Sequence, residues 1–397
     1  MTFQTHPSAA PTTAAATPTP LPAPGHTAVG GEVLAPYPVV VGTGLHEQVG
    51  ALLGEQVQRT ALVHPPKLAT AAHRIAGDLE RHGRYVLPLV VPAGEGAKDA
   101  GVLVYLWSQL AEAGFTRFDA VVALGGGATA DLAGFLAATW QGGIPLILAP
   151  STTAAMTDAA VAGPVALNIP QGKNLAALTH RPAGVVCDLD LLATLPRADH
   201  VSGLAEVVKA GLLADPALLD LIEADPRAVS DPAGEHTREL IERTIRAKAA
   251  LATAATENHA HAGADGPAGQ EERHGQDGRE FLGYGHLLAH AVEHAEGYRI
   301  RHGHALSIGM VYAAELAHQA GRLDAEHVQR HRTVLEALHL PTGYPRHAWE
   351  RLRAAFAPHA AHRGRLRCAV LDAPGRPGLL CDPAPELLHA AYTRLAT

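Results

Sequence analysis

The stretch Asp119-Ala-Val-Val-Ala-Leu-Gly-Gly-Gly-Ala-Thr-Ala-Asp-Leu-Ala-Gly134 decides the fold of the N-terminal half. The five residues after Asp119 form a short apolar run, which predicts a buried β-strand. Gly125, Gly126 and Gly127 follow, and the next residues predict a helix beginning near Thr129. A glycine turn between a strand and a helix N-terminus lets backbone N–H groups approach a pyrophosphate. The turn is not a complete G-x-G-x-x-G, so it could equally serve only as a tight turn.

Strands and helices alternate on both sides of this unit. Further strands are predicted at 38–42, 60–64, 85–91 and 145–150, and helices at 68–82 and 94–113. This alternation is typical of a parallel sheet covered by helices. From about residue 199 helices dominate, at 203–225, 235–256, 287–294, 305–317, 323–338, 346–357 and 384–395, with one strand at 367–371.

The pattern predicts an α/β fold in which a Rossmann-like parallel-sheet domain precedes a mainly α-helical domain. A chain of 397 residues is long enough for two domains that each bury a core. We place the first domain at 31–198 and the second at 199–397. Residues 1–30, rich in Ala, Pro and Thr, predict a disordered tail, and the polar stretch 256–278 predicts a flexible insertion.

Composition excludes several classes of protein. The net charge is −8 and no long basic run occurs, which argues against a nucleic-acid binder. No apolar run approaches the length of a membrane span, and the first residues lack the features of a signal peptide. Cys187, Cys368 and Cys381 are odd in number and form no C-x-x-C, which favours a reducing cytoplasm.

A candidate metal site lies in the second half. His286 and His290 are four residues apart on a predicted helix and therefore share one face. His302 follows after a turn, and Glu206 lies upstream in a helical stretch, three residues before Lys209. Two imidazoles and one carboxylate are a common catalytic zinc set. The chain has 25 histidines, so by themselves these could also be polar surface residues.

Several motifs occur in the order seen in one enzyme family. The chain resembles the 3-dehydroquinate synthase family of sugar-phosphate cyclases from about residue 37 to the C-terminus. The resemblance rests on Gly94-Glu95-Gly96-Ala97-Lys98, the glycine turn with Asp131-Leu132-Ala133-Gly134-Phe135, Ser151-Thr152-Thr153, Asp158, Gly172-Lys173-Asn174, Gly203-Leu204-Ala205-Glu206-Val207-Val208-Lys209 and the histidine cluster.

The resemblance implies two cofactors and a cleft between the domains. The N-terminal domain would bind NAD, the helical domain would bind Zn2+ or Co2+, and a sugar-phosphate substrate would lie between them. NAD would act as a recycled catalyst: a hydroxyl is oxidised, phosphate is eliminated, the ketone is reduced, the ring opens, and an aldol step closes a carbocycle. A cytoplasmic homodimer is also implied.

The resemblance also assigns roles to residues. The metal ligands would be Glu206, His286 and His302. The NAD-binding residues would be Glu95, Lys98, Gly125, Gly126, Gly127, Asp131, Thr152, Thr153 and Lys173. The catalytic and substrate-binding residues would be Lys209, Lys248, Arg279, His290, Asp158 and Asn174, with Arg279 suited to a carboxylate and His290 to a proton shuttle. Surface ion pairs or helix-face polarity are the alternatives for Lys209, Lys248, Arg279 and His290.

The chain departs from the family pattern at residues that surround phosphate in the family. Gly142 stands where the family has Arg, Pro164 where it has Lys, Gly283 where it has Asn, and Ala360-Ala361 where it has Lys-Lys. Each lost charge-assisted contact removes roughly 1.5–3 kcal/mol of binding free energy. These positions therefore predict one altered phosphate pocket, unless other groups compensate, such as His359, His362 or Arg363.

Three hypotheses follow from this pattern. The first is a cyclase of the 3-dehydroquinate synthase type with a changed phosphate pocket. The second is a catalytically impaired homologue that binds NAD and has a regulatory role. The third is an NAD- and zinc-dependent polyol dehydrogenase, against which the retained Lys248 and Arg279 weigh, because they favour a carboxylated substrate.

Overall fold

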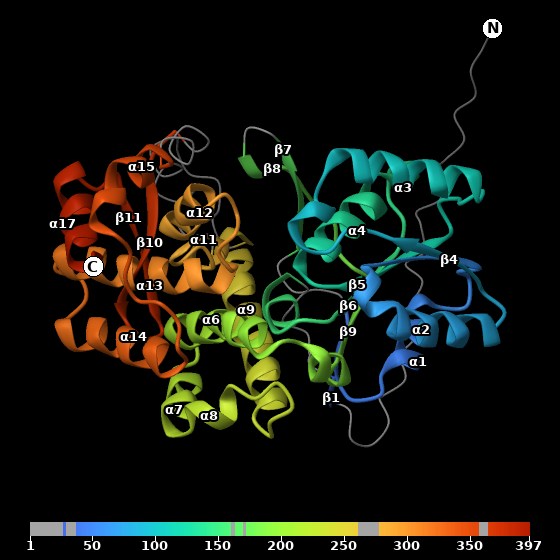
Figure 1. The fold of residues 1–397 in the computed structure, drawn as a ribbon, viewed down its shortest axis with the longest axis horizontal. Helices are drawn as coiled ribbons and strands as arrows, with labels where there is room; N and C mark the ends of the chain where they lie inside the picture. Colours follow the sequence, from blue (N-terminus) through green and yellow to red (C-terminus); the bar gives the residue numbers. More distant parts are fainter. Residues whose placement is uncertain (1–26, 29–36, 160–162, 170–171, 261–277, 357–363) are drawn as a thin grey trace, which may run out of the picture.

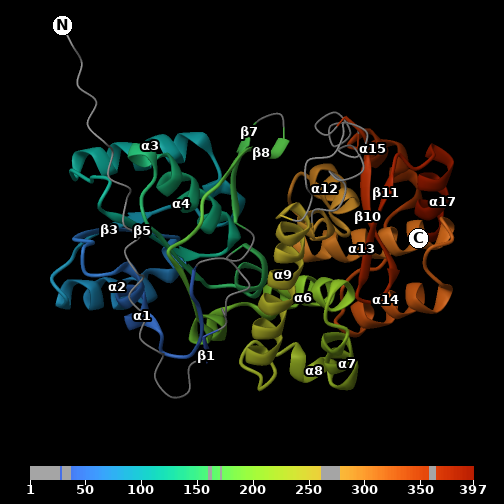
Figure 2. The ribbon, with the colours of Figure 1, turned by 180° about the vertical axis from the view of Figure 1, so that it is seen from behind.

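The computed structural model describes residues 27–28, 37–159, 163–169, 172–260, 278–356 and 364–397. Most of the predicted tail, most of the predicted insertion and residues 359–363 lie outside these ranges. The described chain forms a sheet flanked by helices and a second, mainly helical half. The two halves lie side by side in both ribbon views (Figure 1, Figure 2).

The N-terminal half is built on a seven-stranded sheet with the strand order β1-β2-β9-β6-β5-β3-β4. Its strands are β1 (Thr27–Ala28), β2 (Val39–Gly42), β3 (Arg59–His64), β4 (Tyr85–Val90), β5 (Ala120–Gly125), β6 (Leu146–Pro150) and β9 (Gly184–Asp188). In this order, each neighbouring pair of strands from β2 across the sheet to β4 is parallel, so the predicted parallel sheet is confirmed. The antiparallel strand β1 falls within the stretch predicted as a tail and extends one edge of the sheet.

Successive side chains of the strands enter two different cores, as the alternation of a strand requires. Val39 and Val41 belong to the core formed with α3 (Ala100–Glu112) and α4 (Gly127–Thr139). Val40 belongs to the core formed with α1 (His46–Leu53) and α2 (Ala69–Arg81). Because helices cover both faces, the central strands are apolar throughout rather than alternating.

A hairpin that the sequence pattern does not predict lies between β6 and β9. It follows the π-helical turn η4 (Ala155–Ala159) and consists of β7 (Pro164–Ile169) and β8 (Gly172–Thr179). Pro164, Gly172 and the two asparagines are residue types depleted in strands, which hides the hairpin in the sequence. Val165 packs against Gly134 of α4, and the hairpin reaches toward the helical half (Figure 1).

The C-terminal half is organised around α13 (His302–Gln319). Every residue of α13 from 305 to 317 is buried, because the helix contacts neighbours on all sides. Its neighbours include α6 (Arg197–Leu213), α12 (His286–Ala295), α14 (Ala325–Ala337), α17 (Pro385–Leu395) and β10 (Arg367–Ala373). The other elements are η5 (Leu189–Thr194), α7 (Ala217–Ala224), α8 (Pro226–Val229), α9 (Thr237–Ala260), α11 (Gly278–Phe281), η6 (Arg346–Ala348), α15 (Trp349–Ala354) and β11 (Arg376–Cys381).

The helical half differs from the prediction in local features. The predicted helix 203–225 is two helices, α6 and α7, separated at Pro216 because proline cannot continue a helix interior. The predicted strand at 367–371 becomes β10, which pairs with β11 in a hairpin. β11 is absent from the prediction because Pro377 and Gly378 interrupt its pattern. None of the helices in the described ranges combines the length and apolar character that a membrane span requires.

Candidate active site

The predicted metal ligands Glu206, His286 and His302 lie together although they come from three helices. Glu206 lies within α6, and the two histidines are the first residues of α12 and α13. Oε1 of Glu206 is 3.5 Å from Nε2 of His302 and 4.0 Å from Nε2 of His286. Among the described residues, this buried oxygen has no hydrogen-bond donor. An oxygen without a donor beside two imidazoles fits a divalent transition metal.

Two glycines of α13 set the spacing of the ligand-bearing helices. A Cβ at Gly303 would lie 1.7 Å from the carbonyl oxygen of Ser202 in α6. A Cβ at Gly309 would lie 2.0 Å from the carbonyl oxygen of Gly285, which precedes α12. The N–H of Gly303 also donates to Ser202 Oγ at 3.1 Å. The absence of side chains at these positions therefore brings three helices close enough for their ligands to meet.

Two lysines hold the second oxygen of Glu206. Oε2 is 2.7 Å from Nζ of Lys209 and 2.5 Å from Nζ of Lys248, and all three side chains are buried. Nζ of Lys248 is also 2.5 Å from Oδ1 of Asp158, which belongs to the N-terminal half. The structure thus brings the predicted residues Lys209, Lys248 and Asp158 together around the candidate metal ligands.

Burial and neighbouring charge set the protonation of this cluster. Burial raises the pKa of Glu206, but Lys209 and Lys248 outweigh it and hold the pKa well below its usual range. Burial, together with the positive charge of Lys209, holds the pKa of His286 well below its ordinary value. Glu206 is therefore a carboxylate and His286 a neutral imidazole near neutral pH, which are the forms that bind metal.

Glu293 of α12 supports His302 from the side opposite Glu206. Its Oε1 lies 3.1 Å from Nδ1 of His302 and 3.1 Å from Nζ of Lys173, and this Nζ lies 2.9 Å from Oε1 of Glu95. Burial raises the pKa of Glu293, but the contact with His302 and the charge of Lys173 bring it to about 2. Burial lowers the pKa of His302, but Glu206 and Glu293 raise it to about 9, so a metal bound there would displace a proton from the ring. The ionised Glu293 orients Nδ1 of His302 and leaves Nε2 toward Glu206.

The predicted dinucleotide turn lies between β5 and α4. Gly125 ends the strand and Gly127 begins the helix, whose first N–H groups lack intrahelical acceptors. A Cβ at Gly126 would lie 3.4 Å from Cγ2 of Thr152, so these two residues adjoin. Thr153 does not join them, because its buried hydroxyl lies 2.7 Å from Nδ1 of His200 in α6.

The other predicted NAD-binding residues form a connected cluster. Nζ of Lys98 is 2.5 Å from Oδ2 of Asp131 on α4 and also contacts Oδ1 of Asn174. The N–H of Asn174 donates to Oδ1 of Asn168, whose Nδ2 donates to Oε2 of Glu95 at 2.8 Å. Asn174, predicted at the junction of NAD and substrate, therefore contacts the dinucleotide cluster through Lys98.

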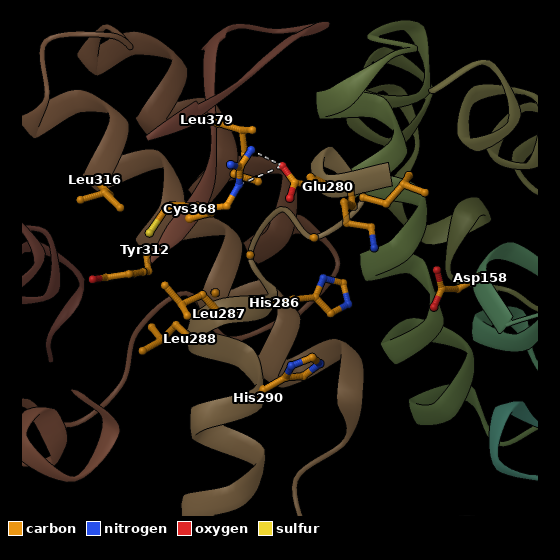
Figure 3. A pocket seen from close by; sticks show the side chains of 18 residues that line it. Asp158, Glu280, His286, Leu287, Leu288, His290, Tyr312, Leu316, Cys368 and Leu379 are labelled. Carbon is orange, nitrogen blue, oxygen red and sulfur yellow. Dashed lines mark hydrogen bonds and ion pairs between the residues drawn. The ribbon is translucent and has the colours of Figure 1, made fainter. Parts of the chain in front are cut away.

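A pocket of about 340 Å³ is lined by the candidate metal ligand His286 (Figure 3). His286 and His290 project from the same side of α12 toward Asp158, with ring centroids 5.2 Å apart. Gly283 forms part of the wall. Arg279 lies in α11 directly before Glu280, which also lines the pocket, but the side chain of Arg279 is outside the described part.

The structure describes the surroundings of three of the replaced family positions. Gly283 lines the pocket beside His286. Gly142 instead lines a shallow depression with Thr179 at the base of the β7–β8 hairpin, and Pro164 pairs with Thr179. The described lining of the pocket includes Gly283 but neither Gly142 nor Pro164, and the prediction of one neighbouring set stays a prediction. Ala360 and Ala361 lie outside the described residues.

Comparison with known proteins gives the family. Residues 88–202 match the family model of the 3-dehydroquinate synthase N-terminal region, and residues 203–359 match that of the C-terminal region. The chain belongs to the 3-dehydroquinate synthase family. A 3-dehydroquinate synthase of Thermobifida fusca is 49% identical over 363 residues, which cover 91% of this chain and 94% of that protein. The predicted family is confirmed.

Solved structures confirm the predicted fold class of this family member. The 2-epi-5-epi-valiolone synthase of Streptomyces hygroscopicus subsp. jinggangensis, with NAD+ and Zn2+ bound, is 24% identical with a TM-score of 0.76, covering 91% of this chain and 97% of that one. A 2-deoxy-scyllo-inosose synthase complexed with carbaglucose-6-phosphate, NAD+ and Co2+ is 22% identical with a TM-score of 0.75, covering 91% and 98%. At these identities the likeness concerns the fold.

Two residues of the candidate site are not among those that the sequence motifs predict. Glu293 stands seven residues after His286, which places both on one face of α12, so helical spacing could have found it. Asn168 comes from the unpredicted hairpin and is linked to Glu95 only in three dimensions.

Proposed function

We propose that this chain is a metal- and NAD-dependent sugar-phosphate cyclase of the 3-dehydroquinate synthase type with altered phosphate binding. Its reaction would be that of a phosphate-eliminating carbon–oxygen lyase that forms a carbocycle. The observation that carries the proposal is Oε1 of Glu206, which is buried, lacks a hydrogen-bond donor among the described residues, and faces Nε2 of both His286 and His302.

The residues assign places to both cofactors. Glu206, His286 and His302 would hold one Zn2+ or Co2+ ion, and the glycine turn with Glu95 and Lys173 would hold NAD. The NAD+, Zn2+ and Co2+ in the two solved relatives support this pair of cofactors. When bound, the metal supplies a Lewis acid for neighbouring substrate hydroxyls, and NAD supplies a hydride acceptor that is restored in each cycle.

The buried cations prepare the pocket for substrate oxygens. An ammonium has three donors, and Lys248 directs two of them to Glu206 and Asp158, which leaves one for a substrate hydroxyl or carboxylate. Lys209 lines the pocket directly. His290, one turn beyond His286 and in the wall of the same pocket, is placed to move a proton to or from the substrate.

The altered phosphate site remains part of the proposal. Among the replaced positions that the structure describes, Gly283 lines the pocket, so we propose that it changes the substrate contact directly. The loss of an Asn side chain removes a donor and enlarges the space beside His286. A substrate other than the usual seven-carbon phosphate would follow, with Arg279 binding its carboxylate.

Release of phosphate from 3-deoxy-arabino-heptulosonate 7-phosphate tests the function. We expect release that depends on added metal and NAD, at a rate far below that of a 3-dehydroquinate synthase with the family residues intact. Metal and NAD binding without any phosphate release would favour the impaired homologue. Oxidation of polyols without phosphate release would favour the dehydrogenase.

Metal analysis tests the site separately from activity. Glu206→Gln should lose the metal, because a neutral amide replaces the carboxylate that faces both histidines. Glu315→Gln is a matched control, because Glu315 is also largely buried and ion-paired, with Arg332, but is no candidate ligand. Equal metal content in the two variants contradicts the assignment.

We further propose a cytoplasmic homodimer, on the basis of the family resemblance. Sedimentation equilibrium of the full chain tests the assembly, and a monomer at micromolar concentration contradicts it.

A further inference from the structure

A line of polar contacts joins the dinucleotide cluster to the metal cluster. It runs from Glu95 to Lys173, from Lys173 to Glu293, and from Glu293 to His302, with distances of 2.9, 3.1 and 3.1 Å. Glu95 and Lys173 belong to the sheet half, whereas Glu293 and His302 belong to the helical half. The line therefore crosses between the halves and ends on a candidate metal ligand.

Glu293 is the shared member of this line. Its side chain is almost fully buried, with 3% of its surface exposed, and both of its contacts fall on the same oxygen, Oε1. The other oxygen, Oε2, is buried without a hydrogen-bond partner within the described part of the chain. The same oxygen thus contacts both Lys173 and His302, so a shift of Lys173 would displace Glu293 and, with it, His302.

We propose that Glu293 is a positioning residue that makes metal binding and NAD binding cooperative through Lys173. This inference rests on the proposed function, because it needs both cofactors. Metal at His302 fixes the imidazole and, with it, Glu293 and Lys173. NAD at Glu95 fixes the other end of the same line. Whichever ligand binds second meets a line that is already ordered, so each tightens the binding of the other.

Removal of Glu293 should have two separable effects. Loss of a carboxylate that orients a metal-bound histidine commonly weakens metal affinity about 10–100-fold. Removal of a residue that only supports the fold would weaken the binding of both ligands or of neither. Removal of a residue that couples the two ligands would also abolish the effect of one ligand on the binding of the other. This second effect is specific to the proposal.

Titration of the metal-free full-length protein with Co2+ measures both effects. Co2+ replaces Zn2+ at such sites, binds less tightly and absorbs visible light. In the wild type, saturating NAD+ should lower the Kd for Co2+ at least about fivefold, the lower end of common coupling factors. In Glu293→Gln the Kd should rise about 10–100-fold, and NAD+ should no longer change it. The affinity of metal-free Glu293→Gln for NAD+ should equal that of the wild type.

Arg301→Gln provides the matched control. Arg301 also carries an ion pair at the N-terminus of α13, with Asp199 at 2.7 Å, but it is half-exposed and touches no candidate ligand. This variant should keep the wild-type coupling. If Glu293→Gln does not fold, Glu293→Asp keeps the carboxylate but shortens the side chain, so it should weaken Co2+ binding and lose the coupling, while the metal-free variant binds NAD+ as the wild type does.

The possible results separate the inference from the proposed function. Independent binding of Co2+ and NAD+ in the wild type, or coupling that survives in Glu293→Gln, overturns the inference and leaves the cyclase proposal standing. Failure of the wild type to bind either ligand overturns both.

Discussion

The close approach of α13 to α6 gives the sharpest prediction, through the substitution Gly303→Ala. The new Cβ would lie 1.7 Å from the carbonyl oxygen of Ser202. A carbon–oxygen contact of this kind needs about 3.3 Å. The two helices would therefore have to separate by roughly 1.5 Å at this point. No rotamer change can relieve the clash, because both partners are held by the backbone.

This separation should disable the metal site. His302 is the residue before Gly303, and metal–ligand distances tolerate only about 0.2 Å of change. We expect Gly303→Ala to lose its stoichiometric metal and to be destabilised by about 1–3 kcal/mol, as is common for overpacked cores. Metal content by atomic emission and urea unfolding of the metal-free protein measure the two effects separately.

Gly77→Ala is the control for this substitution. Gly77 lies in α2, and the nearest atom to its added Cβ would be the end of the Arg81 side chain at 3.9 Å. This variant should keep its metal and gain roughly 0.5–1 kcal/mol of stability, because alanine favours a helix. Full metal content and unchanged stability in Gly303→Ala would refute the idea that this backbone contact sets the ligand geometry.

Three further predictions concern other parts of the molecule. Gly126→Val should abolish NAD binding in calorimetry without unfolding the protein, because the side chain covers the turn beside Thr152; unchanged binding would contradict the assignment. Burial lowers the pKa of His331 to about 4, so the unfolded state takes up a proton first as the pH falls. Its contribution to the free energy of unfolding is essentially complete at about pH 7.5 and falls by about 2 kcal/mol as the pH drops to about 5. His331→Asn should lose this pH dependence in urea unfolding, and an unchanged pH dependence in the variant would contradict the assignment. Pro164→Lys combined with Gly283→Asn should raise phosphate release from the seven-carbon substrate. Because Gly283, unlike Pro164, lines the pocket, most of the gain should come from Gly283→Asn. A gain produced by Pro164→Lys alone would contradict this expectation.

Sequence pattern predicted the regular elements well where one physical signal dominates. The buried strands at 120–125 and 146–150 have no polar alternation because helices cover both faces. The run at 305–317 is apolar except for Gly309, Ser307 and Glu315, because α13 is central. The β7–β8 hairpin and β11 were missed because their prolines and glycines contradict strand propensity, and tertiary packing overrides it.

The residues of the candidate site likewise include some that the sequence could predict and some that it could not. Motif order predicted Glu206, His286 and His302, and the family resemblance predicted Lys209 and Lys248; the structure brings these side chains together. The sequence could not reveal that Glu293 shares one oxygen between Lys173 and His302, because that contact depends on how the two halves meet. Nor could it show that Gly283 lines the pocket beside His286 while Gly142 lines the depression beside Thr179, because both placements depend on tertiary packing.

The order of strands in the sheet has a consequence for synthesis of the chain on the ribosome. β2 is among the first strands to emerge, yet its parallel partner is β9, the last strand of the sheet to be translated. At about 5–20 residues per second, Val39–Gly42 would wait roughly 7–30 s for residues 184–188. During that time its apolar side chains lack their final neighbours. Chaperones that recognise short apolar segments should therefore bind nascent chains of intermediate length and release them once β9 has left the exit tunnel.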